Sequence, residues 1–267
     1  MAIMNTEKFF SGKRKKEDGE AGVGIAEGLR RQVANLLPQK GNGGSNPPPD
    51  AMIEELLRLG VLKFGEFRLK SGRRSPYFFN AAALNNGAGL KLAADAFAEL
   101  ILKERLHERF DVILGAAYKG IPLAAAVALS LAERGINKRF AYDRKEAKDY
   151  GDAADRIFVG DLHSGDRILL IDDVITSGGT KLRLVERLRS VADVEVVALL
   201  VLFDREEKAE NSDLSASELL ERHGIRVYSV LRASEVFRRL KDAGKLSDEE
   251  FAELRMYFER YGAVALN

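Results

Sequence analysis

The chain has no cysteine, no tryptophan, only three histidines and almost no net charge. Without cysteine there are no disulfides and no thiolate chemistry, and three widely separated histidines disfavour a histidine-rich metal site. A formal net charge of +1 argues against a global basic field, so we expect neither a nucleic acid nor a membrane as partner. No apolar run reaches the roughly 18 residues that a membrane span needs. We therefore expect a cytoplasmic protein.

The composition predicts one substantial core behind an N-terminal extension. A chain of 267 residues with 46% hydrophobic content is long enough for one core and a small appended subdomain. Residues 1–50 differ from the rest, because they contain the basic run 13–16 and the glycine-, asparagine- and proline-rich stretch 41–49. We expect 1–50 to be a flexible extension and 51–267 to be one domain. A solvated tail explains the basic run better than a nucleic-acid signal does.

From residue 51 onward, predicted strands and helices alternate. Strands are predicted at 62–69, 77–80, 111–114, 139–142, 167–171, 194–203 and 226–231, and helices at 51–59, 90–101, 122–134, 180–191 and 216–222. Ser215 and Ser247 each stand three residues before a glutamate, a spacing typical of a capping box. The alternation predicts a mainly parallel sheet flanked by helices, in which ligands bind at the carboxyl ends of the strands.

Residues 168–180 are the most informative segment. A predicted apolar strand ends in Asp172 and Asp173, and a loop of small, hydroxylated and glycine residues leads into a helix. Backbone N–H groups in such a loop can surround a phosphate at the positive end of the helix. The two carboxylates would repel that phosphate, but they suit ribose hydroxyls or a metal bridged to them. The segment therefore predicts a phosphorylated ribose as ligand.

A strand that ends in two acids is also typical of a magnesium-binding strand in nucleotide hydrolases. That interpretation requires a Gly-x-x-x-x-Gly-Lys-[Ser/Thr] loop upstream, and the sequence contains none. The segment instead resembles the phosphoribosyl-pyrophosphate (PRPP) signature of type I phosphoribosyltransferases.

Three other segments carry candidate chemistry. Residues 115–120 lie between a predicted strand and helix, where small residues and Lys119 would suit a pyrophosphate, although such turns are common. Residues 143–151 are a solvated loop on charge alone, but their position opposite two phosphate loops favours a mobile lid. Residues 62–80 combine cations with paired aromatics, as in a packed hairpin or a cover over a flat anionic ring. Arg205 could bind a carboxylate through its planar fork.

Four motifs in order, within residues 62–80, 118–122, 144–149 and 172–178, closely resemble orotate phosphoribosyltransferase. The resemblance extends over about 51–265. It implies the type I phosphoribosyltransferase fold, an α/β architecture with a mainly parallel central sheet flanked by helices and a small hood subdomain. The hood elements would span about 51–80, the core about 89–235 and the C-terminal helices about 233–261.

The resemblance also implies the site residues. Those expected to bind PRPP are Lys70, Tyr118, Lys119, Arg144, Lys145, Lys148, Tyr150, Asp172, Asp173, Val174, Ile175, Thr176, Ser177, Gly178, Gly179 and Thr180. Those expected to bind orotate are Lys70, Phe78, Phe79, Thr176 and Arg205. Lys148 stands at the position of the family's catalytic-loop lysine, and Asp172 and Asp173 complete the catalytic set. Mg²⁺ would be held mainly by PRPP, and a homodimer would share its lids between subunits.

The implied reaction is Mg²⁺-dependent transfer of 5-phosphoribosyl from PRPP to orotate, giving orotidine 5′-monophosphate and pyrophosphate in pyrimidine (UMP) biosynthesis. Three positions depart from the family: Tyr150 replaces the usual histidine, Ala153-Ala154 a Gly-Gly pair, and Gly115-Ala116 a frequent Gly-Pro. Two alternatives share the PRPP loop. A purine phosphoribosyltransferase would lack the orotate-side residues. A PRPP-sensing regulator that binds nucleic acid through the basic tail would not need the lid lysines.

Overall fold

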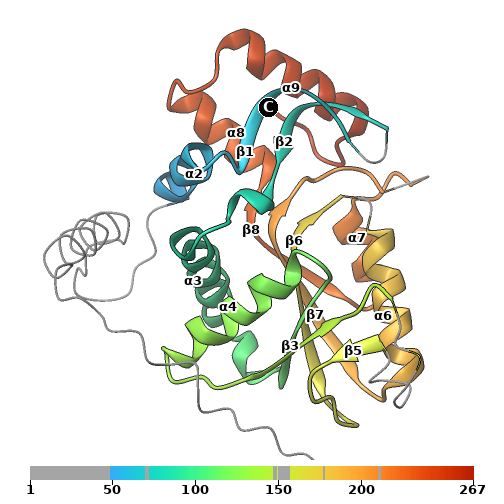
Figure 1. Cartoon of the computed structure of the whole chain (residues 1–267). Coiled ribbons are helices and arrows are strands. Elements are labelled where there is room, and N and C mark those ends of the chain that lie inside the picture. Colours follow the sequence, from blue (N-terminus) through green and yellow to red (C-terminus); the bar gives the residue numbers. More distant parts are fainter. Residues whose placement is uncertain (1–48, 70–71, 147–148, 150–156, 177, 210–211) are drawn as a thin grey trace, which may run out of the picture. The chain divides into compact units, whose positions relative to one another are not determined.

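A six-stranded sheet lies at the centre of the part of the chain that the structure, a computed structural model, describes: residues 49–69, 72–146, 149, 157–176, 178–209 and 212–267. The strand order is β5-β4-β3-β6-β7-β8, and Figure 1 labels these strands except β4. The strands are β3 (Val112–Gly115), β4 (Arg139–Asp143), β5 (Phe158–Val159), β6 (Arg167–Ile175), β7 (Glu195–Asp204) and β8 (Arg226–Arg232). Neighbouring strands run parallel except β5, which is antiparallel to β4. The predicted, mainly parallel sheet is therefore confirmed.

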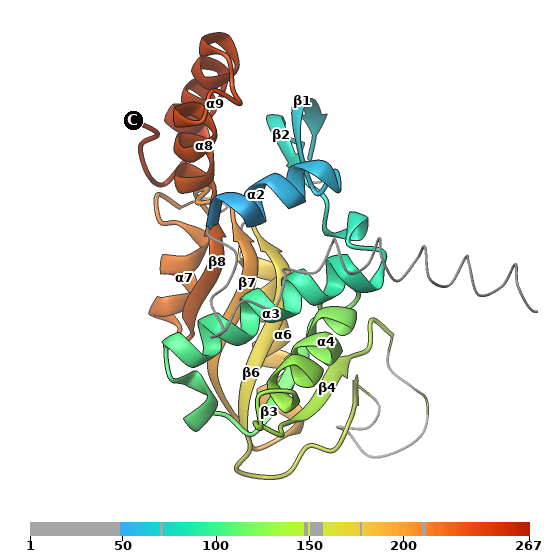
Figure 2. The ribbon, with the colours of Figure 1, turned by 90° about the vertical axis from the view of Figure 1, so that its left-hand side faces the viewer.

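Helices cover both faces of this sheet, and the side chains of β6 show why. Leu169 and Ile171 belong to the hydrophobic cluster of α3 (Gly87–Lys103) and α4 (Gly120–Ala132). Ile168 and Leu170 point the other way, into the cluster of α6 (Gly179–Val191) and α7 (Ala216–Arg222). Figures 1 and 2 show α3 and α4 on one side of the sheet and α6 on the other. Because both faces are buried, the strand is a continuous apolar run rather than an alternating one.

The hood combines early and late segments of the described chain. The helix α2 (Pro49–Arg58) precedes the antiparallel hairpin of β1 (Leu62–Arg68) and β2 (Arg74–Phe79). Two C-terminal helices, α8 (Ala233–Asp242) and α9 (Asp248–Tyr261), lie beside the hairpin (Figure 1). The Tyr77 ring meets the Phe237 ring edge-on, with centroids 4.7 Å apart, and Tyr257 at 5.9 Å. Aromatic packing thus joins β2 to the C-terminal helices.

Several helix and strand ends confirm or correct the sequence-based boundaries. Both predicted capping boxes, at Ser215 and Ser247, are present. The end at residue 171 predicted for the strand that is β6 was wrong, because the ladder with β7 continues through Asp172 and Val174 to Ile175. The two acids are therefore held inside a strand rather than at the start of a loop. No helix in the described residues is both long and apolar enough to cross a membrane.

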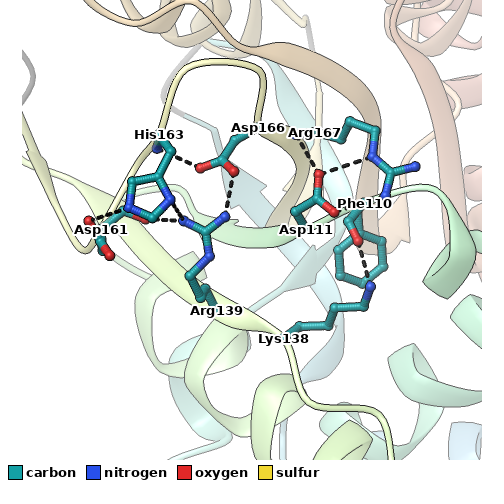
Figure 3. A network of polar contacts seen from close by, with 8 residues as sticks. All are labelled: Phe110, Asp111, Lys138, Arg139, Asp161, His163, Asp166 and Arg167. Atoms are coloured by element: carbon teal, nitrogen blue, oxygen red, sulfur yellow. Dashed lines mark hydrogen bonds and ion pairs between the residues drawn. The ribbon is translucent and has the colours of Figure 1, made fainter.

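A polar network lies at the edge of the sheet where β3, β4 and β6 begin (Figure 3). This edge is opposite the carboxyl ends of the same strands. Arg167 donates to Asp111 from Nε at 3.0 Å and from Nη2 at 2.8 Å, which is a two-point contact. Arg139 pairs with Asp166, whose other carboxylate oxygen accepts the His163 backbone N–H at 2.6 Å. We call these residues the amino-edge network. It fixes the first residues of three strands to one another.

Candidate active site

The loop between β3 and α4, Gly115–Gly120, is termed the cradle. A Cβ atom on Gly115 would lie 2.4 Å from the carbonyl oxygen of Gly120, and one on Gly120 would lie 2.4 Å from that of Ile171. No larger residue fits either position without moving backbone. The Ala117 N–H donates to the carboxylate of Asp143 at the end of β4. The cradle is thus held against two neighbouring strands.

Three predicted pyrophosphate-binding residues lie at or beside the cradle: Tyr118, Lys119 and Lys145. Tyr118 is 70% exposed, and the peptide bond that precedes it is cis. Lys145, from the segment after β4, places its Nζ 5.9 Å from the centroid of the Tyr118 ring. The Lys119 Nζ donates to Asp173 Oδ2 at 2.9 Å. The structure therefore brings the cradle, the start of the predicted lid and the acids of β6 into one neighbourhood.

The two acids of β6 each have a lysine partner, and both are only 6% exposed. Asp172 accepts the Asp173 backbone N–H on Oδ1 at 2.8 Å and pairs with Lys181 through Oδ2. Asp173 pairs with Lys119. Burial lowers the pKa of Lys181 to about 8, and repulsion by Lys145 and Lys119 acts in the same direction. The acids are thus neutralised from two sides, by the cradle and by α6.

The loop that was predicted to surround a phosphate follows directly after β6. Thr176 is exposed, and Gly178 caps α6 with a φ of +75°, a left-handed conformation that favours glycine. Thr180, in the first turn of α6, is also exposed, and its Oγ1 accepts a bond from Arg183 at 3.4 Å. The first N–H groups of a helix have no intrahelical partners, so this end of α6 suits an anion. Ile175 is buried and anchors the strand beneath the loop.

A cavity of about 280 Å³ opens between the cradle, the segment after β4 and α6. Its lining residues are Ala116, Ala117, Asp143, Lys145, Asp172, Thr180, Lys181, Arg183, Leu184 and Arg187. Lysine and arginine outnumber aspartate in this lining, so the cavity favours an anionic ligand. A second hollow of about 310 Å³ lies between α2 and α8 and is lined by none of the predicted site residues.

The residues predicted to bind orotate lie deeper than the sequence suggests. Phe78 is half-buried and stacks on Phe67, with ring centroids 5.5 Å apart. Phe79 is only 3% exposed and stacks on Phe203 of β7 at 4.5 Å. The Phe79 ring thus belongs to the core rather than to an open cover. Its contact with orotate stays a prediction, as does that of Phe78.

Arg205 is only 2% exposed, and its guanidinium already binds a carboxylate, that of Glu207. Its Nε donates to Glu207 at 2.7 Å and its Nη2 to the Ser75 hydroxyl at 3.1 Å. The Tyr257 hydroxyl donates to the same Glu207 oxygen at 2.6 Å. Because both buried charges have partners, neither carries the penalty of an unpaired ion. The guanidinium of Arg205 therefore does bind a carboxylate, as predicted for this side chain, but that carboxylate belongs to the protein. The contacts join β2, the segment after β7 and α9.

The remaining predicted residues are placed as follows. Arg144 is half-buried, its backbone N–H donates to the Ile157 carbonyl at 2.7 Å, and its own carbonyl accepts Arg187 at 3.0 Å. Val174 is half-buried and Gly179 begins α6. The predictions for Lys70, Lys148, Tyr150 and Ser177 lie outside the described residues.

Neither Asp143, at the start of the predicted lid segment, nor Lys181 was itself predicted as a site residue. A signal for each exists in the sequence. Asp143 follows a predicted strand just as the acids of β6 do. Lys181 is a cation in the first turn of a helix, where the macrodipole disfavours it and a nearby acid is needed.

Comparison with known proteins defines the class. The family described as the phosphoribosyl transferase domain matches residues 81–240, which include the cradle, the acids and the phosphate loop.

Three similar proteins narrow the class further. The orotate phosphoribosyltransferase of Bifidobacterium adolescentis is 39% identical over 223 residues, covering 79% of this chain and 96% of that protein. The crystal structure of orotate phosphoribosyltransferase from Francisella tularensis is 37% identical, with a TM-score of 0.69, over 79% of this chain and 99% of that one. Leishmania donovani UMP synthase is 27% identical, with a TM-score of 0.65, over 91% of this chain and 48% of that one. The chain belongs to the orotate phosphoribosyltransferase family.

Proposed function

We propose that the chain transfers the 5-phosphoribosyl group of PRPP to orotate, giving orotidine 5′-monophosphate and pyrophosphate, in UMP biosynthesis. The observation that carries the proposal is the convergence of Asp172, Asp173, the cradle and the N-terminus of α6 at one edge of the sheet. This edge offers ribose-binding carboxylates between two anion-binding loops, which matches a sugar that carries phosphate at both ends. Membership of the orotate phosphoribosyltransferase family supports orotate as the acceptor.

The roles of the residues follow from the charges in the reaction. As the anomeric carbon loses pyrophosphate it gains oxocarbenium character, and negative charge gathers on the leaving group. Lys119 and Lys145 stand where they can offset that charge, with Lys148 as the lid cation that meets it. The loop Thr176–Thr180 and the first turn of α6 bind the 5-phosphate and so hold the sugar in position. The protein's contribution is therefore mainly electrostatic and positional.

Magnesium is part of this proposal, and the residues present fit it as a substrate-bound ion. The described residues include no cluster of three or more histidines, aspartates or glutamates that could hold a metal alone. Mg²⁺ keeps several waters and is bound by one or two carboxylates together with substrate phosphates, a role open to Asp173, whose partner Lys119 is exposed. When bound with PRPP, the ion would neutralise pyrophosphate charge.

We further propose a cytoplasmic homodimer in which the lid that follows β4 reaches the neighbouring subunit's site. The family resemblance supports this assembly. Leu129 on α4 and Phe140 on β4 are large apolar side chains, 69% and 43% exposed, which a second copy would cover.

The reaction is tested by following the loss of orotate absorbance with purified chain, PRPP and Mg²⁺. We expect turnover that needs all three components and stops on chelation of the metal. Adenine or hypoxanthine in place of orotate is the matched control. PRPP consumption with a purine but not with orotate would overturn the proposal.

The shared lid is tested by mixing two inactive variants. Lys148→Ala should lower kcat roughly 100-fold or more, the scale of one lost preorganised contact. Mixing it with Asp173→Asn should restore activity, because one site of each mixed dimer then combines an intact lid with intact acids. No recovery after verified subunit exchange would mean that each chain builds its own site.

A further inference from the structure

Lys181 occupies an unusual position in the first turn of α6. Its side chain is only 12% exposed, although a lysine on a helix surface normally extends its amine into water. The helix dipole disfavours a cation at this end, and burial adds a desolvation cost. The side chain nevertheless turns inward, and its Nζ meets Asp172 Oδ2. Because the contact with Asp172 forms despite the helix dipole and the desolvation cost, we infer that it matters to the site.

The two acid–lysine pairs differ in how firmly they are held. Asp172 has both oxygens engaged, one by the Asp173 N–H at 2.8 Å and the other by Lys181. Asp173 is held through Oδ2 by Lys119, whose side chain is 45% exposed and extends from the cradle. An exposed lysine can exchange its partner at little cost, whereas a buried one cannot leave without stranding a charge.

The charges of the proposed substrate explain why one acid–lysine pair would be fixed and the other replaceable. PRPP carries phosphate at both ends of its ribose, and two adjacent bare carboxylates would repel it. Lys119 can move from Asp173 to the pyrophosphate when the substrate arrives, which frees Asp173 for the ribose hydroxyls. Lys181 also lines the cavity, but its side chain is only 12% exposed, so it leaves Asp172 less readily than Lys119 leaves Asp173.

We propose that Lys181 is a positioning residue for PRPP binding. It fixes the Asp172 carboxylate in one orientation and offsets its charge with or without substrate, while the Lys119–Asp173 pair is the one that the substrate opens. The inference rests on the proposed function only in taking PRPP as the ligand. It assigns Lys181 no contact with the reacting atoms.

The test compares Lys181→Met, Lys181→Arg and the control Arg189→Met, which changes an exposed cation of the same helix. Binding of PRPP with Mg²⁺ is measured by calorimetry without orotate, and KM is measured for both substrates. For Lys181→Met we expect PRPP binding to weaken roughly ten-fold, the scale of one charge-assisted hydrogen bond. The KM for orotate should stay within about two-fold, and arginine should restore part of the PRPP affinity.

A double-mutant cycle separates positioning from direct contact and from misfolding. Asp172→Asn with Lys181→Met removes both charges, so no buried ion is left unpaired. If Lys181 acts through Asp172, the double variant binds PRPP as Asp172→Asn does. Additive losses of PRPP affinity would show that Lys181 contacts the substrate itself. Unchanged PRPP binding in Lys181→Met would show that Lys181 has no part in binding. Either result overturns the inference. Because the binding readout needs no turnover, failure of orotate transfer would be seen separately.

Discussion

The two edges of the central sheet hold similar acid–cation pairs, but with different cations. At the amino edge, Arg167 grips Asp111 through two nitrogens of its planar guanidinium. At the carboxyl edge, Lys119 meets Asp173 through a single ammonium group. An arginine fork fixes both distance and orientation, whereas an ammonium is a point charge on a flexible stem. The arginine pair suits permanent structure, whereas the exposed ammonium of Lys119 suits a contact that a ligand replaces.

This contrast predicts that substitutions at the two edges separate stability from activity. Substitutions at the carboxyl edge should lower turnover with little effect on the free energy of unfolding. The amino-edge network should do the reverse, because it lies where the strands begin rather than where ligands bind in such sheets (Figure 3).

The largest effect is expected for Asp173→Asn. The variant keeps the shape of the side chain but loses the charge that pairs with Lys119 and would receive the ribose hydroxyls. We expect kcat/KM for PRPP to fall roughly 100-fold, with a nearly unchanged melting temperature, measured by steady-state kinetics and thermal unfolding. Asp213→Asn, at a 98% exposed carboxylate, is the control. A loss confined to stability would remove the distinction between the edges.

An intermediate effect is expected for Asp166→Asn. This carboxylate is 7% exposed, pairs with Arg139 and accepts the His163 N–H. Its replacement should lower the free energy of unfolding by about 1–3 kcal/mol, the range for hydrogen bonds to charged groups, as measured by urea denaturation. The kcat should stay within about two-fold of the parent. A large drop in kcat with unchanged stability would contradict the structural role.

The smallest effect, and a pH-dependent one, is expected for Asp111→Asn. Hydrogen bonding from Arg167 holds the pKa of Asp111 well below its usual range. The resulting stability is present above the unfolded-state pKa of about 4 and is lost as the pH falls from there toward the folded-state pKa. Near neutral pH the variant should lose about 1 kcal/mol or less, because the pair is partly exposed.

The measurement for Asp111→Asn is the free energy of unfolding between about pH 7 and pH 2. The difference between parent and variant should shrink as the pH falls below about 4, because the parent carboxyl then becomes neutral as well. A difference that stays constant over this range would show that the charge of Asp111 is not what stabilises the edge.

The fold could be predicted from sequence because its signals are local. The apolar run before Asp172 and the capping boxes at Ser215 and Ser247 each depend on residues within a few positions. The end of β6 could not be placed, because pairing of Asp172 and Ile175 with a strand more than twenty residues away decides it. The short β5 likewise gives too few residues for a periodic pattern.

The site was predicted where motifs are contiguous and missed where it depends on packing. Asp173 and Lys119 lie in recognisable motifs, and the structure joins them. The burial of Arg205 depends on Glu207 and on Tyr257 in the last helix, a contact that sequence spacing does not reveal. Lys181 was missed for the same reason, since only the fold brings it onto Asp172.

Gly115 and Gly120 leave no room for a side chain at either end of the cradle. Neither would meet the substrate through a functional group, yet an added methyl at either would collide with a backbone carbonyl. In a survey of every single substitution, these two positions would be as intolerant as Asp173. Intolerance to substitution would therefore identify the course of the main chain here, and not only the groups that perform the chemistry.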